Sequence, residues 1–157
     1  MTTLAAILGP AGDCAGRWPG GAPGESPYVV IVAKETVTGL AAAHDLVRQY
    51  RCDLAGDAAE LVGVITVAHQ PGRVPKSLRL YRDKILLPLV PEDAGRWRID
   101  WQEDWPLTAP EKLPLWTPDA QKPAKGRDPL EPVRGIGEQI IEFIKARRAL
   151  RHEGTLR

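Results

Sequence analysis

The segment His69-Gln70-Pro71-Gly72-Arg73-Val74-Pro75-Lys76 carries the residue types best suited to hold a ligand. It follows a continuous apolar run at 61–67, which is typical of a buried strand, and open α/β sheets bind ligands at the carboxyl ends of their strands. Pro75 suits the first turn of a helix, where backbone N–H groups attract anions. We therefore expect an anion- or ligand-binding loop formed by His69, Gln70, Gly72, Arg73 and Lys76. A Pro-Gly turn beside a basic residue is equally a common surface feature.

Other chemically capable side chains have no motif around them. His44 falls on the apolar face of a predicted helix, and no Ser or Cys nucleophile motif accompanies it, so we expect a hydrogen-bonded, half-buried histidine. Cys14 and Cys52 lie far apart, without C-x-x-C spacing or clustered histidines. The sequence therefore predicts no catalytic residue, no metal site and no cofactor.

Two clusters raise the question of a macromolecular partner. In Arg96-Trp97-Arg98 the arginines alternate with an aromatic ring, but acidic residues follow at once, so we expect core packing and not base stacking. Arg147 and Arg148 lie in a basic cluster that suits the negative end of a helix dipole, and a weak contact with DNA phosphates is the alternative. Trp116 belongs to the short hydrophobic segment Leu113-Pro114-Leu115-Trp116. We expect this hydrophobic anchor to dock on its own domain or on a partner.

These residues need a scaffold, and the apolar patterns predict an α/β domain with a short, mostly parallel sheet flanked by helices. Buried strands are expected at 28–33 and 61–67, and an alternating edge strand at 96–101. Thr36 is expected to cap the first crossover helix. The expected apolar faces are Val37, Leu40, Ala41, His44, Val47 and Arg51 for that helix, and Leu78, Tyr81 and Ile85 for the next.

The rest of the chain divides around a proline-rich stretch. Residues 106–132 contain seven prolines, which exclude a regular helix or a central strand and predict an extended arm. The sequence therefore predicts an α/β domain at 1–105, an arm at 106–132 and a C-terminal amphipathic helix and tail at 133–157.

Composition excludes few classes of function. The 157 residues carry a net charge of +1, so no overall field attracts nucleic acid or an anionic membrane. No apolar run approaches the roughly 20 residues of a membrane span, and no signal peptide is evident. A cytoplasmic protein without a membrane partner is the expectation.

Three segments resemble the ParA/MinD-like P-loop ATPases. M-T-T-L-A-A-I-L is similar to the end of a Walker A motif and its helix, Y-V-V-I-V-A-K-E-T-V-T-G-L-A-A-A-H-D-L to an internal strand and helix, and L-V-G-V-I-T-V-A to a later strand. The stretch H-Q-P-G-R-V-P-K-S-L-R, followed by R-W-R-I-D-W-Q-E-D-W, resembles a poorly characterised branch of these domains from high-GC bacteria, some of which are carried on mobile elements. The resemblance covers about residues 1–105. It implies a truncated P-loop fold in which Thr2 or Thr3 is the remnant of the Mg²⁺-binding hydroxyl.

The departures from this family concern its catalytic parts. A P-loop needs glycines that wrap the phosphates and a Lys that reaches them, and here the chain begins at Met1 without them. The position of the base-reading Asn holds Val67. The sequence therefore predicts a non-catalytic, pseudo-ATPase adaptor that binds a protein partner or a second copy through an open sheet edge. Coverage of that edge by the chain's own proline-rich arm is the other expected arrangement. Alternatives are an ATP/Mg-binding switch with an upstream P-loop, and a weak DNA-binding accessory protein.

Overall fold

A computed structural model describes residues 3–126 and 128–155. The chain forms two compact units, each described by itself: the sheet unit, Gly16–Glu103, and the terminal unit, which combines Met1–Ala15 with Asp104–Arg157. The break near residue 104 lies close to the predicted boundary at 105. The first fifteen residues, however, group with the C-terminal segment and not with the sheet.

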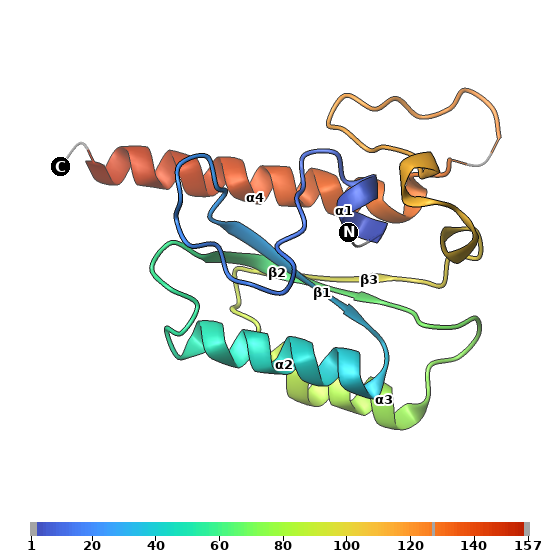
Figure 1. Ribbon diagram of the computed structural model, residues 1–157, viewed down its shortest axis with the longest axis horizontal. Coiled ribbons are helices and arrows are strands. Elements are labelled where there is room, and N and C mark those ends of the chain that lie inside the picture. The colour runs from blue at the N-terminus through green and yellow to red at the C-terminus, as the bar shows by residue number, and fades with distance from the viewer. Residues whose placement is uncertain (1–2, 127, 156–157) are drawn as a thin grey trace. The chain divides into compact units, whose positions relative to one another are not determined.

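The sheet unit contains three parallel strands in the order β1-β2-β3, with β2 in the centre. The strands are β1 (Tyr28–Lys34), β2 (Glu60–Val67) and β3 (Gly95–Ile99). Their two connections place α2 (Val37–Arg51) and α3 (Lys76–Tyr81) on the same face of the sheet (Figure 1), as right-handed crossovers between sequential strands require. The predicted fold class, α/β with a short parallel sheet flanked by helices, is confirmed.

The first crossover helix, α2, begins as predicted at Thr36, whose hydroxyl accepts a hydrogen bond from the Gly39 N–H at 3.0 Å. Its buried face agrees with the expected one at Leu40 and Val47 and differs from it at Val37 and Arg51. Leu40, Ala43 and Val47 are buried, whereas Val37 is 72% exposed. Val37 is the first residue of α2, one helical turn before the first buried position, Leu40.

The second crossover changes its helical geometry in the middle. After α3, residues Arg82–Leu86 form a π-helical turn and Leu87–Leu89 a 3₁₀ turn. A π-turn contains one extra residue, so the buried position after Tyr81 moves from Ile85 to Leu86. The prediction for Ile85 is therefore wrong: Ile85 is 44% exposed and Leu86 is fully buried.

The core of this unit lies between the sheet and the helices on that face. Ile31 and Ala33 of β1 and Val64 of β2 pack there with apolar residues of both crossovers, including Leu86 and Val90. β2 is buried almost throughout, as predicted for a central strand. β1 was expected to be buried on both faces. Ile31 and Ala33 are buried on the face that the helices cover, but Val32, on the opposite face, is 42% exposed.

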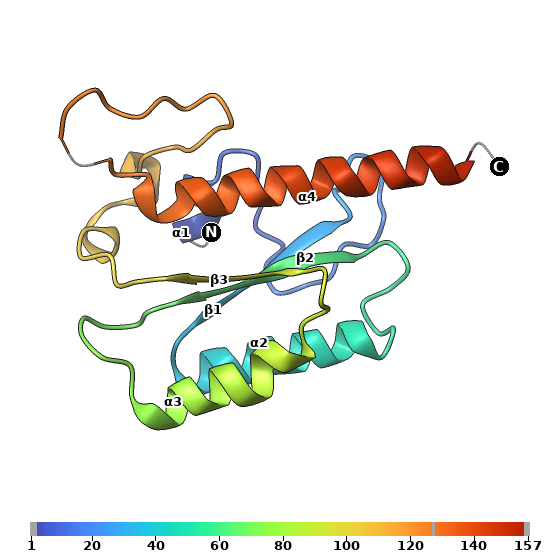
Figure 2. The ribbon, with the colours of Figure 1, turned by 180° about the vertical axis from the view of Figure 1, so that it is seen from behind.

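The terminal unit consists of α1 (Thr3–Ile7), the proline-rich arm and α4 (Glu131–Thr155), which Figure 2 shows from behind. In the described part of the arm, short 3₁₀ turns form at Trp105–Leu107 and Pro110–Lys112 and a single β-bridge joins Trp116 to Leu8, so no regular helix or long strand occurs there, as the prolines predicted. Buried Arg134 of α4 holds the arm through the Asp128 carboxylate at 2.9 Å and the carbonyl oxygen of Ala120 at 2.5 Å. No helix within the described ranges is long and apolar enough to cross a lipid bilayer.

Candidate functional site

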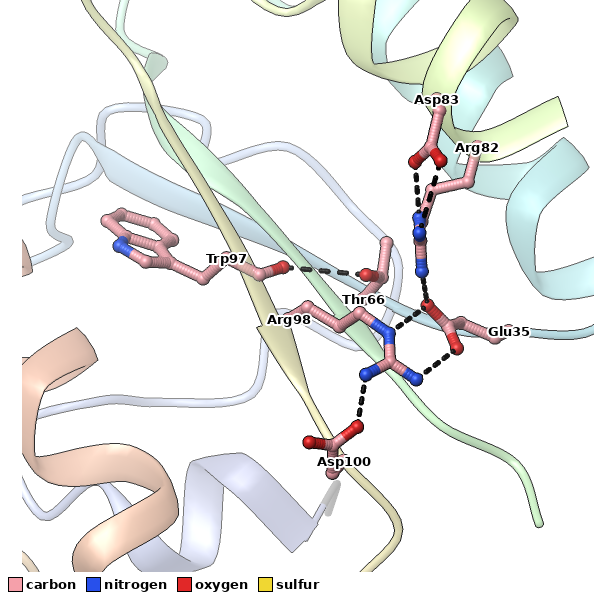
Figure 3. Close-up of polar contacts among 7 residues, drawn as sticks. All are labelled: Glu35, Thr66, Arg82, Asp83, Trp97, Arg98 and Asp100. Atoms are coloured by element: carbon pink, nitrogen blue, oxygen red, sulfur yellow. Dashed lines mark hydrogen bonds and ion pairs between the residues drawn. The ribbon is translucent and has the colours of Figure 1, made fainter. Parts of the chain in front are cut away.

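The carboxyl edge of the sheet brings together three charged residues from three elements. Glu35 directly follows β1, Arg98 is near the end of β3, and Arg82 opens the π-turn (Figure 3). The Nε of Arg98 lies 2.9 Å from Oε1 of Glu35, and its Nη2 lies 3.2 Å from Oε2. Arg82 Nη1 also donates to Oε1 of Glu35. One carboxylate, 1% exposed, thus joins two guanidinium groups.

Strand alternation explains why these side chains meet. Ile31, Ala33 and Glu35 follow one another on the helix-covered face of β1. The register aligns Ala33 with Thr66 of β2, and Thr66 with Arg98 of β3. Because neighbouring strands lie about 4.8 Å apart, the long Arg98 side chain can pass the small Thr66 and reach Glu35.

Two further carboxylates complete the cluster. Asp83 accepts from Arg82 Nε at 2.7 Å, and Asp100 accepts from Arg98 Nη1. The hydrogen bond from Arg82 is the main cause that lowers the pKa of Asp83 below its usual value. The hydrogen bond to Glu35 is the main cause that raises the pKa of Arg98, and that to Asp83 the main cause that raises the pKa of Arg82. Both guanidinium groups therefore stay charged.

The charge balance of this cluster argues against an anion site. Three carboxylates, Glu35, Asp83 and Asp100, accompany two guanidinium groups, so the cluster carries a formal excess of one negative charge. The principal donors of both arginines already point at these carboxylates (Figure 3). The arrangement joins the ends of β1 and β3 to the second crossover, and its chemistry is that of a structural ion-pair network.

The predicted ligand loop lies after β2 but does not form a concentrated site. All five of its candidate residues are exposed: His69, Gln70, Gly72, Arg73 and Lys76. Gly72 has a φ of +85°, which explains why glycine occupies this turn. α3 contains only six residues, and Pro75 provides no side-chain cap. None of the hydrogen bonds and ion pairs described for the charged cluster involves a residue of this loop.

The other candidate residues are dispersed. Thr3 begins α1 in the terminal unit, and Thr2 lies outside the described residues. Trp116 is 3% exposed, and its ring packs where a side chain at Gly137 of α4 would otherwise lie. The Trp116 ring is thus buried within its own unit, whereas the neighbouring Leu115 is 58% exposed.

The remaining predictions concern two helices. The guanidinium of Arg147 lies over the Phe143 ring, 5.1 Å from its centroid, and Arg148 is exposed near the end of α4. Nδ1 of His44 lies 3.0 Å from the Tyr81 hydroxyl oxygen, and the side chain is half-buried. This confirms the expectation of a hydrogen-bonded histidine between α2 and α3.

The outer edge of β1 is the second feature of the sheet unit. The Glu35 N–H donates to the Val67 carbonyl at 2.8 Å, and the Pro27 carbonyl accepts from the Glu60 N–H at 2.7 Å. Because backbone groups alternate along a strand, those of Val30 and Val32 point away from β2. Within Gly16–Glu103 no strand lies beyond β1, and no hydrogen bond is made by these outward groups.

Sequence reasoning did not identify Glu35 or Arg82 as interacting residues. The available signal was an acidic residue immediately after a buried strand, where a carboxylate is costly unless it is paired. Within the described parts of the chain, no three His, Cys, Asp or Glu side chains are placed to hold a metal ion. A scan of protein-family models, a search of curated proteins and a search of solved structures returned no match to this chain.

Proposed function

We propose that this chain is a non-catalytic, partner-binding protein and that its binding element is the outer edge of β1. The observation that carries the proposal is the pair of outward-facing backbone units at Val30 and Val32, which have no partner within the sheet unit. An extended segment that adds to a sheet edge gains main-chain hydrogen bonds, and side chains on alternate positions provide specificity.

Side chains along this edge support the same function. Natural edge strands are usually protected by charges, prolines or bulges. Here the run Tyr28–Ala33 contains neither a charge nor a proline, and Val32 is 42% exposed. The pairing of β1 with β2 is irregular between Val29 and Val30, but the extra residue there is Val62 of β2 and not a residue of β1. Pro27 and Lys34 stand only at its two ends, so the intervening edge is open to another strand.

The charged cluster supports a non-catalytic role. Glu35, Arg82 and Arg98 satisfy one another and are joined by Asp83 and Asp100. Under this proposal the chain is a cytoplasmic adaptor, in the partition-type or mobile-element setting that the ParA-like sequence resemblance implies.

The test is capture of a partner with two matched variants. Val32→Pro removes the outward N–H, and proline is tolerated at such an edge position. Val32→Thr keeps the N–H and the branched side chain. A partner that binds the edge should be retained by wild type and Val32→Thr and lost with Val32→Pro, and chemical cross-links should map to residues 28–34. Equal capture by all three proteins, or cross-links confined elsewhere, would contradict the proposal.

A further inference from the structure

We propose that the strand bound at this edge is β1 of a second copy, paired antiparallel about a two-fold axis that passes beside Ile31. The inference rests on the proposed function and names its partner. It would join two three-stranded sheets into one continuous sheet of six strands.

The backbone of β1 is symmetric about Ile31. The outward-facing residues are Val30 and Val32, flanked by Tyr28 and Lys34. When two such strands run antiparallel about this axis, Val30 of each chain lies opposite Val32 of the other chain. Each of these pairs exchanges two N–H···O bonds. The outward groups that lack partners in one chain thus satisfy those of the other.

The side chains are compatible with the same register. Ile31 then lies opposite its own copy, and Val29 lies opposite Ala33, so the centre of the interface contains only apolar pairs. β-branched residues directly opposite each other stabilise an antiparallel pair. Lys34 lies opposite the Tyr28 ring and not opposite another lysine, so no like charges meet across the strands.

The neighbouring registers are poorer. A shift that places Val32 opposite Val32 moves Lys34 opposite Val30 and leaves Tyr28 beyond the partner strand. A shift that places Val30 opposite Val30 leaves Lys34 without a strand residue opposite it. Only the register centred on Ile31 overlaps the full length of Tyr28–Lys34. An isologous, two-fold arrangement is also the commonest symmetry of homo-oligomers.

The first test is the mass of the purified chain by sedimentation over a range of concentrations. Wild type and Val32→Thr are expected to form dimers. Val32→Pro should raise the dimer dissociation constant about thirtyfold, because two backbone hydrogen bonds are lost per dimer. A circular dichroism spectrum unchanged from wild type shows that Val32→Pro still folds. As a measurement that needs no variant, the amide protons of Val30 and Val32 should exchange more slowly as the concentration rises.

The register is tested by disulfide trapping in a Cys14→Ser, Cys52→Ser background. A mixture of Val30→Cys and Val32→Cys chains should form a disulfide-linked heterodimer, and neither chain should cross-link efficiently with itself. Self-linking of Val32→Cys or of Val30→Cys would overturn the register centred on Ile31.

The outcomes separate this inference from the proposed function. A chain that is monomeric at every concentration, with rapid exchange of the Val30 and Val32 amides, overturns self-pairing. If that monomer still captures a protein that Val32→Pro loses, the edge binds a different partner and the proposed function stands. If neither pairing nor capture depends on Val32, both fail.

Discussion

Glu35 and Arg98, 63 positions apart in the sequence, form a two-point ion pair in which both carboxylate oxygens accept from one guanidinium group, at 2.9 and 3.2 Å. The pair spans β2 and joins the end of β1 to β3. Arg82 adds a third contact from the second crossover. Three elements that are separate in the sequence thus depend on one buried carboxylate for their relative positions.

Glu35→Gln should destabilise the fold. The substitution preserves the size of the side chain but leaves Arg82 and Arg98 close together without their shared counter-charge. Loss of one partner from a buried pair costs about 3–5 kcal/mol. Because Arg98 is 34% exposed, we expect Glu35→Gln to lower the free energy of unfolding by roughly 2–4 kcal/mol, as measured by urea unfolding.

The matched control for this prediction is Asp100→Asn. Asp100 also contacts Arg98, but its side chain is 81% exposed. Exposed ion pairs contribute little, so the loss should stay below about 1 kcal/mol. Similar losses for Glu35→Gln and Asp100→Asn would show that burial of the Glu35 carboxylate has no special weight in this network.

Asp83 should make a pH-dependent contribution to stability. The hydrogen bond from Arg82 lowers its pKa in the folded state, so the folded chain binds this proton less tightly than the unfolded chain. The resulting stabilisation is complete above the unfolded pKa of about 3.9 and is lost as the pH falls through the folded pKa. The difference in unfolding free energy between wild type and Asp83→Asn should therefore be constant near neutrality and shrink below about pH 4.

Arg82→Gln provides the control for that pH profile. In this background the donor to Asp83 is absent, and the attraction of Arg79 and Lys84 is what still lowers the Asp83 pKa. Adding Asp83→Asn should therefore produce a smaller pH-dependent difference between the two proteins than in the wild-type background. An undiminished difference in the Arg82→Gln background would show that the hydrogen bond from Arg82 is not the main cause of the lowered Asp83 pKa.

The strands could be predicted from the sequence because their signals are local. The run Tyr28–Ala33 and the run Leu61–Val67 are too short and too β-branched for helices, and the alternation around Trp97 defined the third strand. Thr36 was likewise identifiable because a cap acts within three residues of itself.

The features that could not be predicted from the sequence depend on contacts between residues that lie far apart along the chain. The contacts of Glu35 come from β3 and from the π-turn, and neither partner lies near it in sequence. Helical periodicity assumes a constant turn, so it assigned Ile85 to the core, whereas the π-turn places Leu86 there.

The π-turn predicts opposite sensitivities at adjacent residues. Leu86→Ala should cost about 2–5 kcal/mol, since it empties a fully buried site. Ile85→Ala should cost less than about 1 kcal/mol, because 44% of Ile85 is exposed. Urea unfolding of both variants measures the difference. Equal losses, or a larger loss at Ile85, would mean that the helix continues with regular α-helical phase.

Two glycines of α4 should respond oppositely to alanine. In a helix interior, Gly→Ala ordinarily stabilises by about 0.5–1 kcal/mol. At exposed Gly135 an added Cβ meets nothing within 4 Å, so Gly135→Ala should show this gain. At Gly137 the Cβ would lie 2.6 Å from the Trp116 ring, which is 3% exposed and has little room to move. The clash should outweigh the gain, and Gly137→Ala should destabilise by roughly 1–2 kcal/mol in urea unfolding. Stabilisation by Gly137→Ala, with unchanged Trp fluorescence, would show that Trp116 does not pack against this face of α4.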